Sequence, residues 1–174
     1  MAVFRAFKAL RPTEGKAAAV AALPYDVVNR EEAAAIGKEN PDSFLHVDRA
    51  EMDLPAETDL YDGRVYQKAK ENLHKMEETG VLVQDNKPCY YIYELVRKGK
   101  VQTGIAGCAS IDDYLNNVVK KHELTRSDKE LDRINHVDVC DANTGPIYLA
   151  CRYTDALSAL LAQWKKEHKA AYDF

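Results

Sequence analysis

VVKKHELTRSDKELDR, residues 118–133, is the stretch with the densest chemistry in the chain. Its sixteen positions hold five Lys or Arg, four Asp or Glu, and one His. Upstream of it, apolar residues recur at helical spacing, and Ser110 with Asp113 has the pattern of a capping box at the predicted helix start. His122 continues this stripe, so we expect it to point inward from the last turn, where a helix C-terminus favours a protonated imidazole. The other members of the stripe are Ile111, Tyr114, Leu115, Val118 and Val119.

A second helix is predicted to begin inside the same stretch. Thr125 and Ser127 are both favourable N-cap residues, and Glu130 follows Ser127 at capping-box spacing. Leu131 and Ile134 are expected to mark the buried face of this helix. The chain therefore ends one helix and starts another near Ser127.

The start of this second helix is a candidate anion site. Arg126, Glu130 and Arg133 share one face by their spacing, and two cations beside the free N–H groups of a helix N-terminus attract anions. The alternative is a set of solvated surface ion pairs, which is the commonest role of Glu and Arg at this spacing. A zincin is excluded, because Arg126 stands where HExxH needs its second His.

Composition indicates one soluble domain that is not built for nucleic acid. The 174 residues are 46% hydrophobic and 30% charged, which suits a single domain spanning residues 1–174. The net charge of −4 argues against a protein that neutralises many phosphates, so a nucleic-acid partner is not favoured. No apolar run is long enough to span a membrane, and we expect a cytoplasmic protein.

The four cysteines show no metal-binding pattern. Cys89, Cys108, Cys140 and Cys151 form no CxxC pair and have no His at zinc-finger spacing. We therefore expect free thiols, mostly buried, and no metal held by them.

The chain before this region is predicted to contain two further helices. Asn29 and Glu32 form a capping box that opens a short helix, which should end near Gly37 or at the Asn40-Pro41 break. A long helix is expected over about residues 57–79, with Gly80 as its C′ residue. Its buried stripe is Tyr61, Val65, Ala69, Leu73 and Met76.

The chain after this region is predicted to end in a helix capped by Thr154. Its apolar stripe includes Leu161 and Trp164, which we expect to form an exposed patch because their packing partners would lie beyond this chain. Strands are predicted at residues 3–10, 43–47, 81–84, 89–96, 101–110 and 147–152, with a hairpin turn at 97–100. The expected fold class is α+β, a mixed sheet of about five or six strands flanked by about five helices.

The predicted ligand site lies where the second helix begins, beside the Thr144-Gly145 turn and the extended segment that ends at Asp26. Asp26 precedes a helix start, so its carboxylate either serves the helix dipole or faces the pocket, and Glu31 has the same two interpretations. The candidate catalytic residues are His122, Glu123, Asp26 and Glu31, the phosphate-binding candidates are Arg126, Arg133, Ser127 and Thr125, and the other pocket residues are Tyr25, His46, Thr144 and Gly145.

Several motifs together resemble the family called domain of unknown function 1015. They are PYDVVN at 24–29, NPDSFLHV at 40–47, QTGI and DDY within 102–114, KKHELTR at 120–126, KELDR at 129–133 and TGPIYL at 144–149. The resemblance covers essentially the whole chain. Members of that family are longer, so the resemblance implies that this chain is an N-terminal portion and that the remaining C-terminal part is a partner.

The family is in turn distantly similar to the ParB/sulfiredoxin-like superfamily, which implies that fold. Some members are described as sporulation or chromosome-partition regulators, others lie beside serine-biosynthesis genes, and a free serine kinase belongs to the superfamily. Those relatives hold nucleotide phosphates on a Gly-x-x-Arg segment at a helix start. The segment from His122 to Arg126 is the counterpart here, with Lys120 and Lys121 before it and no glycine.

Two functional hypotheses follow. The first is an enzyme that binds a nucleotide or a phosphorylated small metabolite, such as a phosphotransferase linked to serine metabolism, with ATP or ADP and Mg²⁺ as the implied cofactors. His122 or Glu123 would act as acid or base, and Asp26 or Glu31 would activate a hydroxyl or hold Mg²⁺. The second is a ParB-like regulatory or nucleic-acid-associated module.

Overall fold

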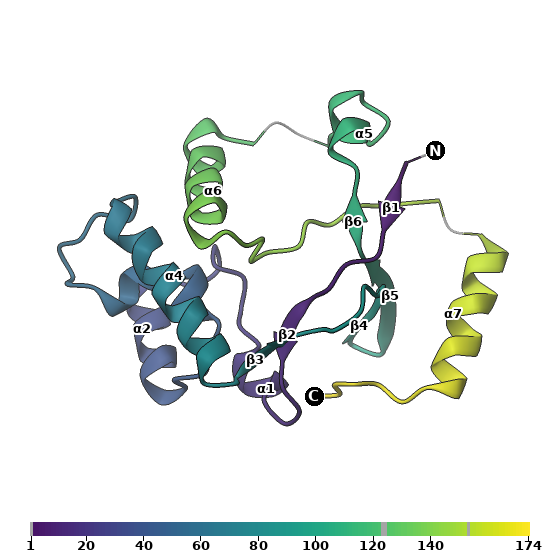
Figure 1. The fold of residues 1–174 in the computed structure, drawn as a ribbon, viewed down its shortest axis with the longest axis horizontal. Coiled ribbons are helices and arrows are strands. Elements are labelled where there is room, and N and C mark those ends of the chain that lie inside the picture. Colours follow the sequence, from purple (N-terminus) through teal and green to yellow (C-terminus); the bar gives the residue numbers. More distant parts are fainter. Residues whose placement is uncertain (1, 123–124, 153) are drawn as a thin grey trace. The chain divides into compact units, whose positions relative to one another are not determined.

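The structure, a computed structural model, describes residues 2–122, 125–152 and 154–174 (Figure 1). The chain divides into two compact units that are interleaved in sequence. The first unit comprises Met1–Ala9, Gln84–Leu124 and Pro146–Asp173, and the second comprises Leu10–Val83 and Thr125–Gly145 with Phe174. That residues 1–174 form a single domain stays a prediction.

The predicted α+β composition is confirmed. In the described part of the chain the strands pair two by two, as β1 with β6, β2 with β3 and β4 with β5. A single sheet of five or six strands is not among the described elements. The paired segments are short or exposed, and seven α-helices supply most of the regular structure in these residues.

The second unit is mainly helical. Its largest helix, α4, spans Gly63–Glu78 and packs against α3 and α6. The remaining elements are β2 (Leu10–Pro12), α1 (Ala17–Val20), α2 (Arg30–Glu39), α3 (Leu45–Asp48), η1 (Ala50–Asp53), β3 (Leu82–Gln84) and α6 (Ser127–Cys140).

Helix α2 begins at the capping box that the sequence predicts. Glu32 N donates to Asn29 Oδ1 over 2.9 Å, and Asn29 N donates to Glu32 Oε2 over 2.8 Å. The helix runs through Gly37 and ends before the Asn40-Pro41 break. At Gly37 a Cβ atom would lie 2.6 Å from Met52 Cε, so the glycine lets the η1 segment approach α2 closely.

Helix α4 carries the core. Val65, Ala69, Leu73 and Met76 are buried as predicted, and they pack in one cluster with buried residues of α3, η1 and α6. Gly80 has φ +73°, which confirms its place just after the helix end. The start at 57 is wrong, because Asp62 caps the helix by accepting from Arg64 N, so Tyr61 lies outside it.

The strand predicted at residues 43–47 is a helix. Leu45 and Val47 are both buried, as alternation suggested, but they lie in the single turn of α3. The carbonyl of His46 accepts from Asn72 Nδ2 of α4 over 2.7 Å. A short apolar run has no periodicity that separates a strand from a buried helical turn, so packing against α4 decides.

Arg30 joins the first turn of α2 to the segment after η1. The guanidinium forms five hydrogen bonds to backbone carbonyls, a planar set of donors that no other side chain offers. Its Nη1 donates to Ala56 O and Thr58 O, and its Nη2 donates to Glu51 O, Leu54 O and Pro55 O. Residues 51–58, which begin in η1 and continue as an irregular segment, are thereby held against α2.

The first unit contains the strand pairs β1 (Phe4–Arg5) with β6 (Cys108–Ala109) and β4 (Tyr91–Arg97) with β5 (Lys100–Ala106), both antiparallel. Lys98 and Gly99 have φ of 50° and 74°, so the predicted hairpin turn is confirmed with both central residues in the left-handed region. The single strand predicted over 3–10 is interrupted. Between β1 and β2 only Phe7 pairs, in an isolated bridge with Cys89.

Gly107, between β5 and β6, admits a close neighbour that a side chain would exclude. A Cβ atom there would lie 2.6 Å from two atoms of the Phe4 ring and 3.0 Å from Arg5 O. Gly104 has ordinary spacing, with Tyr93 O at 3.9 Å. The glycine at 107 therefore allows β1 to lie on β6.

The helix predicted to reach His122 is much shorter. Helix α5 spans Ile111–Leu115 and is capped by Ser110, but the Asp113 carboxylate accepts from Val3 N over 2.6 Å and does not complete a capping box. Asn117 has φ 58°, and Val118 N donates to Asp113 O, which is the hydrogen-bond pattern of a Schellman end. His122 is consequently exposed and outside any helix.

At the end of the first unit the predicted helix is confirmed and the predicted strand is absent. Helix α7 spans Asp155–Glu167, with Thr154 accepting from Leu157 N as predicted. Residues 147–152 form no strand. The expected exposure is wrong for Leu161, which is buried, and confirmed for Trp164, which is half exposed and stacks on His168.

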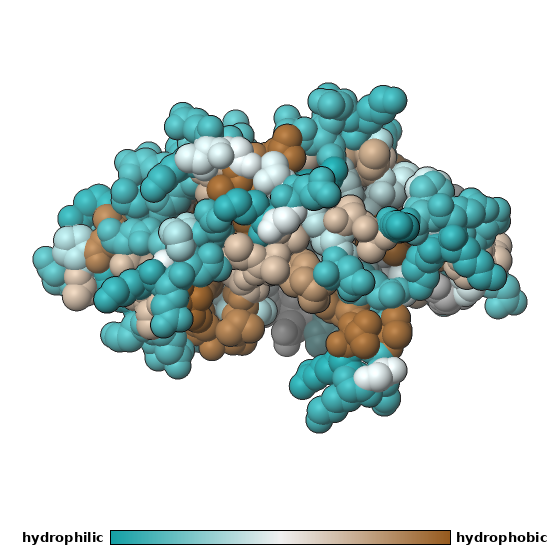
Figure 2. All heavy atoms as spheres, turned by 90° about the horizontal axis from the view of Figure 1, so that it is seen from below, coloured by the Kyte–Doolittle hydropathy of each residue, from teal (hydrophilic) through white to brown (hydrophobic). Residues whose placement is uncertain are grey.

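Surface apolar residues also occur elsewhere. On the face drawn in Figure 2, apolar side chains interrupt the hydrophilic surface at several places. The four cysteines are free, but only Cys140 is buried, so the expectation that most of them are buried is wrong. No helix in the described ranges is long and apolar enough to cross a membrane.

We predict that Arg30→Ala lowers the free energy of unfolding by about 2–4 kcal/mol, because several carbonyls of residues 51–58 lose a charged donor at once. Urea unfolding followed by circular dichroism measures this loss. Arg64→Ala is the matched control, since its guanidinium is exposed and pairs only locally with Asp62. A similar loss in both variants would contradict the assigned role of Arg30.

Candidate functional site

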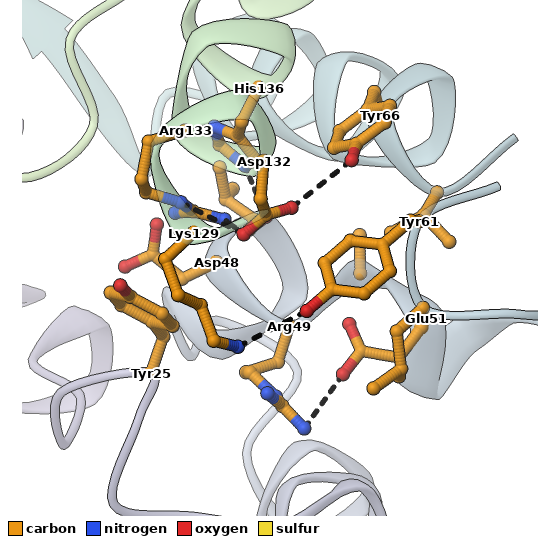
Figure 3. Close-up of a pocket in the computed structure, with 14 residues that line it drawn as sticks. Tyr25, Asp48, Arg49, Glu51, Tyr61, Tyr66, Lys129, Asp132, Arg133 and His136 are labelled. Carbon is orange, nitrogen blue, oxygen red and sulfur yellow. Dashed lines mark hydrogen bonds and ion pairs between the residues drawn. The ribbon is translucent and has the colours of Figure 1, made fainter. Parts of the chain in front are cut away.

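The second unit holds a small polar recess between α3, η1, the start of α4, and α6 (Figure 3). Its cavity volume is about 40 Å³, enough for a group the size of a few water molecules. We call it the polar recess. Its polar lining residues are Tyr25, Asp48, Arg49, Glu51, Tyr61, Tyr66, Lys129, Asp132, Arg133 and His136.

Helix α6 supplies four of these side chains from one face. Positions 129, 132, 133 and 136 are spaced i, i+3, i+4 and i+7, so they fall on the same side of a helix. The predicted buried face is wrong, because Leu131 and Ile134 are 58% and 56% exposed. The polar face points inward because its side chains form hydrogen bonds with Val47 of α3 and Tyr66 of α4.

His136 is the most deeply buried of these side chains. Its Nε2 lies 3.1 Å from the carbonyl oxygen of Val47. A carbonyl only accepts, so Nε2 carries a proton and donates it. The other ring nitrogen, Nδ1, is buried and has no hydrogen-bond partner among the described residues.

Asp132 and Arg133 form a second fixed group. Asp132 accepts from Tyr66 Oη over 3.1 Å and from Arg133 Nη2 over 3.0 Å. The Arg133 guanidinium also stacks over the Tyr25 ring at 4.4 Å from its centroid. Burial raises the pKa of Tyr66, so its hydroxyl stays a donor to Asp132 at neutral pH.

Asp48, at the end of α3, has a perturbed carboxyl group. Burial raises its pKa, and the nearby His136, the Thr144 hydroxyl and Arg133 oppose this effect without cancelling it. Thr144 donates its side-chain hydrogen bond to this carboxyl. The Asp48 carboxyl group is therefore protonated more easily than an ordinary Asp.

Arg49 and Glu51 form a nearly buried ion pair. Arg49 Nη2 lies 2.9 Å from Glu51 Oε1, and the Glu51 side chain is only 6% exposed. The contact is short but poorly aligned, because Arg49 Nε and Glu51 Oε1 both lack a partner in hydrogen-bond geometry. The recess therefore holds a donor and an acceptor that are not fully satisfied by the described residues.

Lys129 stands where the recess meets a wider hollow of about 550 Å³. Its ammonium donates to Tyr61 Oη over 3.3 Å and lies 5.8 Å from the centroid of that ring. The two hollows share Tyr25, Lys129 and Arg133. The wider one is bordered by apolar side chains of α6, including Ile134.

The structure brings some of the predicted site residues to this place. Arg133 and Tyr25 line the polar recess, and Thr144 reaches Asp48. Thr125 borders the wider hollow. His46 takes part in a separate cluster, where its Nδ1 lies 2.8 Å from Asp53 Oδ2.

Other predicted residues lie elsewhere. Arg126 is the residue before α6, is 77% exposed, and pairs with Asp128 at 2.7 Å. Ser127 is exposed and does not cap α6. The remaining residues outside the recess are Asp26, Glu31 and Gly145, all exposed, and His122, which belongs to the first unit. Glu123 lies outside the described residues.

Comparison with known proteins then places the chain in a family. Residues 4–174 match the model of the family described as "Protein of unknown function (DUF1015)". The chain belongs to this family. Neither a curated protein nor a solved structure matches it significantly. The likeness of this DUF1015 chain to ParB and sulfiredoxin stays a prediction.

In this DUF1015 chain, most of the recess residues that sequence reasoning missed lie in or near two Asp-Arg pairs, of which only Arg133 was predicted. Asp48-Arg49 precedes Glu51, and Asp132-Arg133 precedes His136 in a helix whose buried face was predicted from its apolar residues. A polar stripe at helical spacing could have indicated these positions. Among the described residues, no group of three or more His, Cys, Asp or Glu is placed to hold a metal ion.

The His46–Asp53 pair leads to a prediction of pH dependence. The hydrogen bond that His46 Nδ1 donates to Asp53 is the main cause that raises the pKa of His46. Burial acts to raise the pKa of Asp53, but hydrogen bonds from His46 and Asn72 outweigh it and lower that pKa. The stability that His46 contributes is therefore fully present below the ordinary His pKa and is lost as pH rises through its raised pKa. The stability that Asp53 contributes is present above the ordinary Asp pKa and is lost as pH falls through its lowered pKa.

We expect this pair to stabilise the protein most between about pH 4.5 and 6.5. His46→Gln should remove up to about 1 kcal/mol of unfolding free energy at pH 5.5 and less at pH 8.5, after allowance for solvent screening. Urea unfolding at both pH values measures the difference. His74→Gln is the control. An equal loss at both pH values would show that His46 acts only by packing.

Proposed function

We propose that the polar recess binds the phosphate group of a small phosphorylated metabolite or nucleotide, and that the chain acts on this ligand as an enzyme of the phosphotransferase type. The observation that carries the proposal is the convergence of Arg49, Lys129 and Arg133 on one recess. Three cations in one partly enclosed place offer charged N–H donors to the oxygens of a phosphate.

Lys129 is the strongest single support for an anionic ligand. Within the described part of the chain its ammonium contacts the hydroxyl and ring of Tyr61, and no carboxylate pairs with it. Arg133 is already oriented by Asp132 and Tyr25, so its remaining N–H donors are held in place. A fixed guanidinium beside a free ammonium suits the oxygens of a phosphate group.

Asp48 supports an enzymatic role. Phosphoryl transfer needs charge neutralisation and one group that takes or gives a proton at the reacting oxygen. A carboxyl group with a raised pKa in the same recess as the cations is suited to that task. Nucleotide binding with Mg²⁺ and a link to serine metabolism stay predictions from the family resemblance, as does the alternative of a ParB-like regulatory module.

The wider hollow supports a ligand larger than phosphate itself. Its volume of about 550 Å³ is in the range of small-molecule sites, and it shares three residues with the recess. A phosphate in the recess would leave the remainder of a metabolite or nucleotide beside Tyr25 and the apolar residues of α6.

We predict that ethyl phosphate, ADP or ATP raises the melting temperature of the protein in a concentration-dependent way, since a ligand at 100 times its Kd adds about 2.7 kcal/mol of stability. Lys129→Ala should weaken binding of the ligand that responds by at least about tenfold, because it removes an unpaired cation. Its melting temperature without ligand should stay unchanged, since the ammonium is exposed.

Arg126→Ala is the matched control, because Arg126 is an exposed cation next to the same helix. The proposal expects it to bind like the parent. Binding lost in Arg126→Ala and kept in Lys129→Ala would move the site to the start of α6, where the sequence pattern placed it. No stabilisation of the parent by any of the three phosphates would refute the proposal.

A further inference from the structure

The polar recess is balanced in charge before any ligand binds. Three cations face three carboxyl groups, and a phosphate dianion alone would leave the filled recess with two excess negative charges. A partly buried excess charge is unfavourable unless a counter-charge accompanies it. The groups are Arg49, Lys129 and Arg133 against Asp48, Glu51 and Asp132.

The three carboxyl groups differ in what they already bind. Asp132 accepts from Tyr66 and Arg133, and Asp48 accepts from Thr144. Glu51 has Arg49 at 2.9 Å on one side, yet its Oε1 is buried without an aligned donor among the described residues. Among the described carboxylates of the recess, Glu51 is therefore the one with a buried oxygen that lacks a hydrogen-bond donor, which a ligand could supply.

The arrangement in Figure 3 separates two ends of the recess. Arg133 and Tyr25 lie on one side, Glu51 and Arg49 lie on the other, and the Lys129 ammonium lies between them. A phosphate held by Lys129 and Arg133 would thus have Glu51 across the recess. A short ligand with a negative group at one end and a positive group at the other matches the cations Lys129 and Arg133 and the Glu51 carboxylate across from them.

We propose, on the basis of the proposed function, that the ligand is a phosphate monoester that also carries a protonated amino group. Its phosphate binds Lys129 and Arg133, and its ammonium donates to Glu51. The ammonium removes one of the two excess negative charges and supplies the donor that Glu51 Oε1 lacks. A hydroxyl in its place would supply a donor without the charge.

The test compares 2-aminoethyl phosphate with ethyl phosphate, which have the same phosphate ester and differ at the amino group. Isothermal titration calorimetry with the parent protein should give an affinity at least about tenfold higher for the aminoethyl ester. Glu51→Gln, which keeps the shape of the side chain, should abolish this preference and keep the binding of ethyl phosphate.

The outcomes separate this inference from the proposed function. If ethyl phosphate binds the parent and depends on Lys129, but the aminoethyl ester binds no better, the proposed function stands and the amino preference is refuted. A preference that persists in Glu51→Gln also refutes it. If neither ester binds but ADP or ATP does, the amino preference is refuted and the proposed function stands. If none of these ligands binds, both proposals fall.

A second measurement needs no variant and therefore does not depend on how Glu51→Gln folds. Phosphocholine has the charge of the aminoethyl ester but no N–H donor. The preference of the parent should fall severalfold with phosphocholine, because Glu51 Oε1 then stays without a donor. Equal affinity for phosphocholine and the aminoethyl ester would overturn the assignment of Glu51 as the acceptor.

Discussion

The guanidinium of Arg30 is the constraint on which the geometry of the candidate site depends. Residues 51–58 have little regular structure, and their carbonyls converge on this one side chain. The same segment carries Glu51 into the polar recess and leads toward Tyr61. Because the donors of a guanidinium are coplanar and fixed, five carbonyls that bind them are oriented together. A residue outside the recess therefore sets the position of one of its walls.

Local signals predicted the parts of the fold whose determinants are adjacent in sequence. The capping box of Asn29 and Glu32, the stripe of α4 and the cap at Thr154 are each complete within one turn or one helix. Residues 43–47 and 147–152 were predicted wrongly because a short apolar run takes its structure from what packs on it. The length of α5 depended on Asn117, whose left-handed conformation was not read from the sequence.

The candidate site could be predicted only in part, for a related reason. Arg133, Tyr25 and Thr144 were expected near an anion, but the inward face of α6 was assigned to its apolar residues. Polar side chains turn inward there because Tyr66 Oη and the Val47 carbonyl offer them hydrogen bonds. Those partners are 66 and 89 residues away in sequence, so hydrophobic periodicity carries no trace of them.

The interleaving of the two units has a consequence for the order in which the protein can form on the ribosome. In the second unit, residues 10–83 leave the ribosome first. Cys140 and His136, which are buried in the same unit, follow only after residues 84–124 have been made. Strand β1 likewise waits for β6, more than 100 positions later. Such a chain has high contact order, which slows folding and leaves apolar surface uncovered during synthesis. The core around α4 therefore stays incomplete until residues 125–140 have been made.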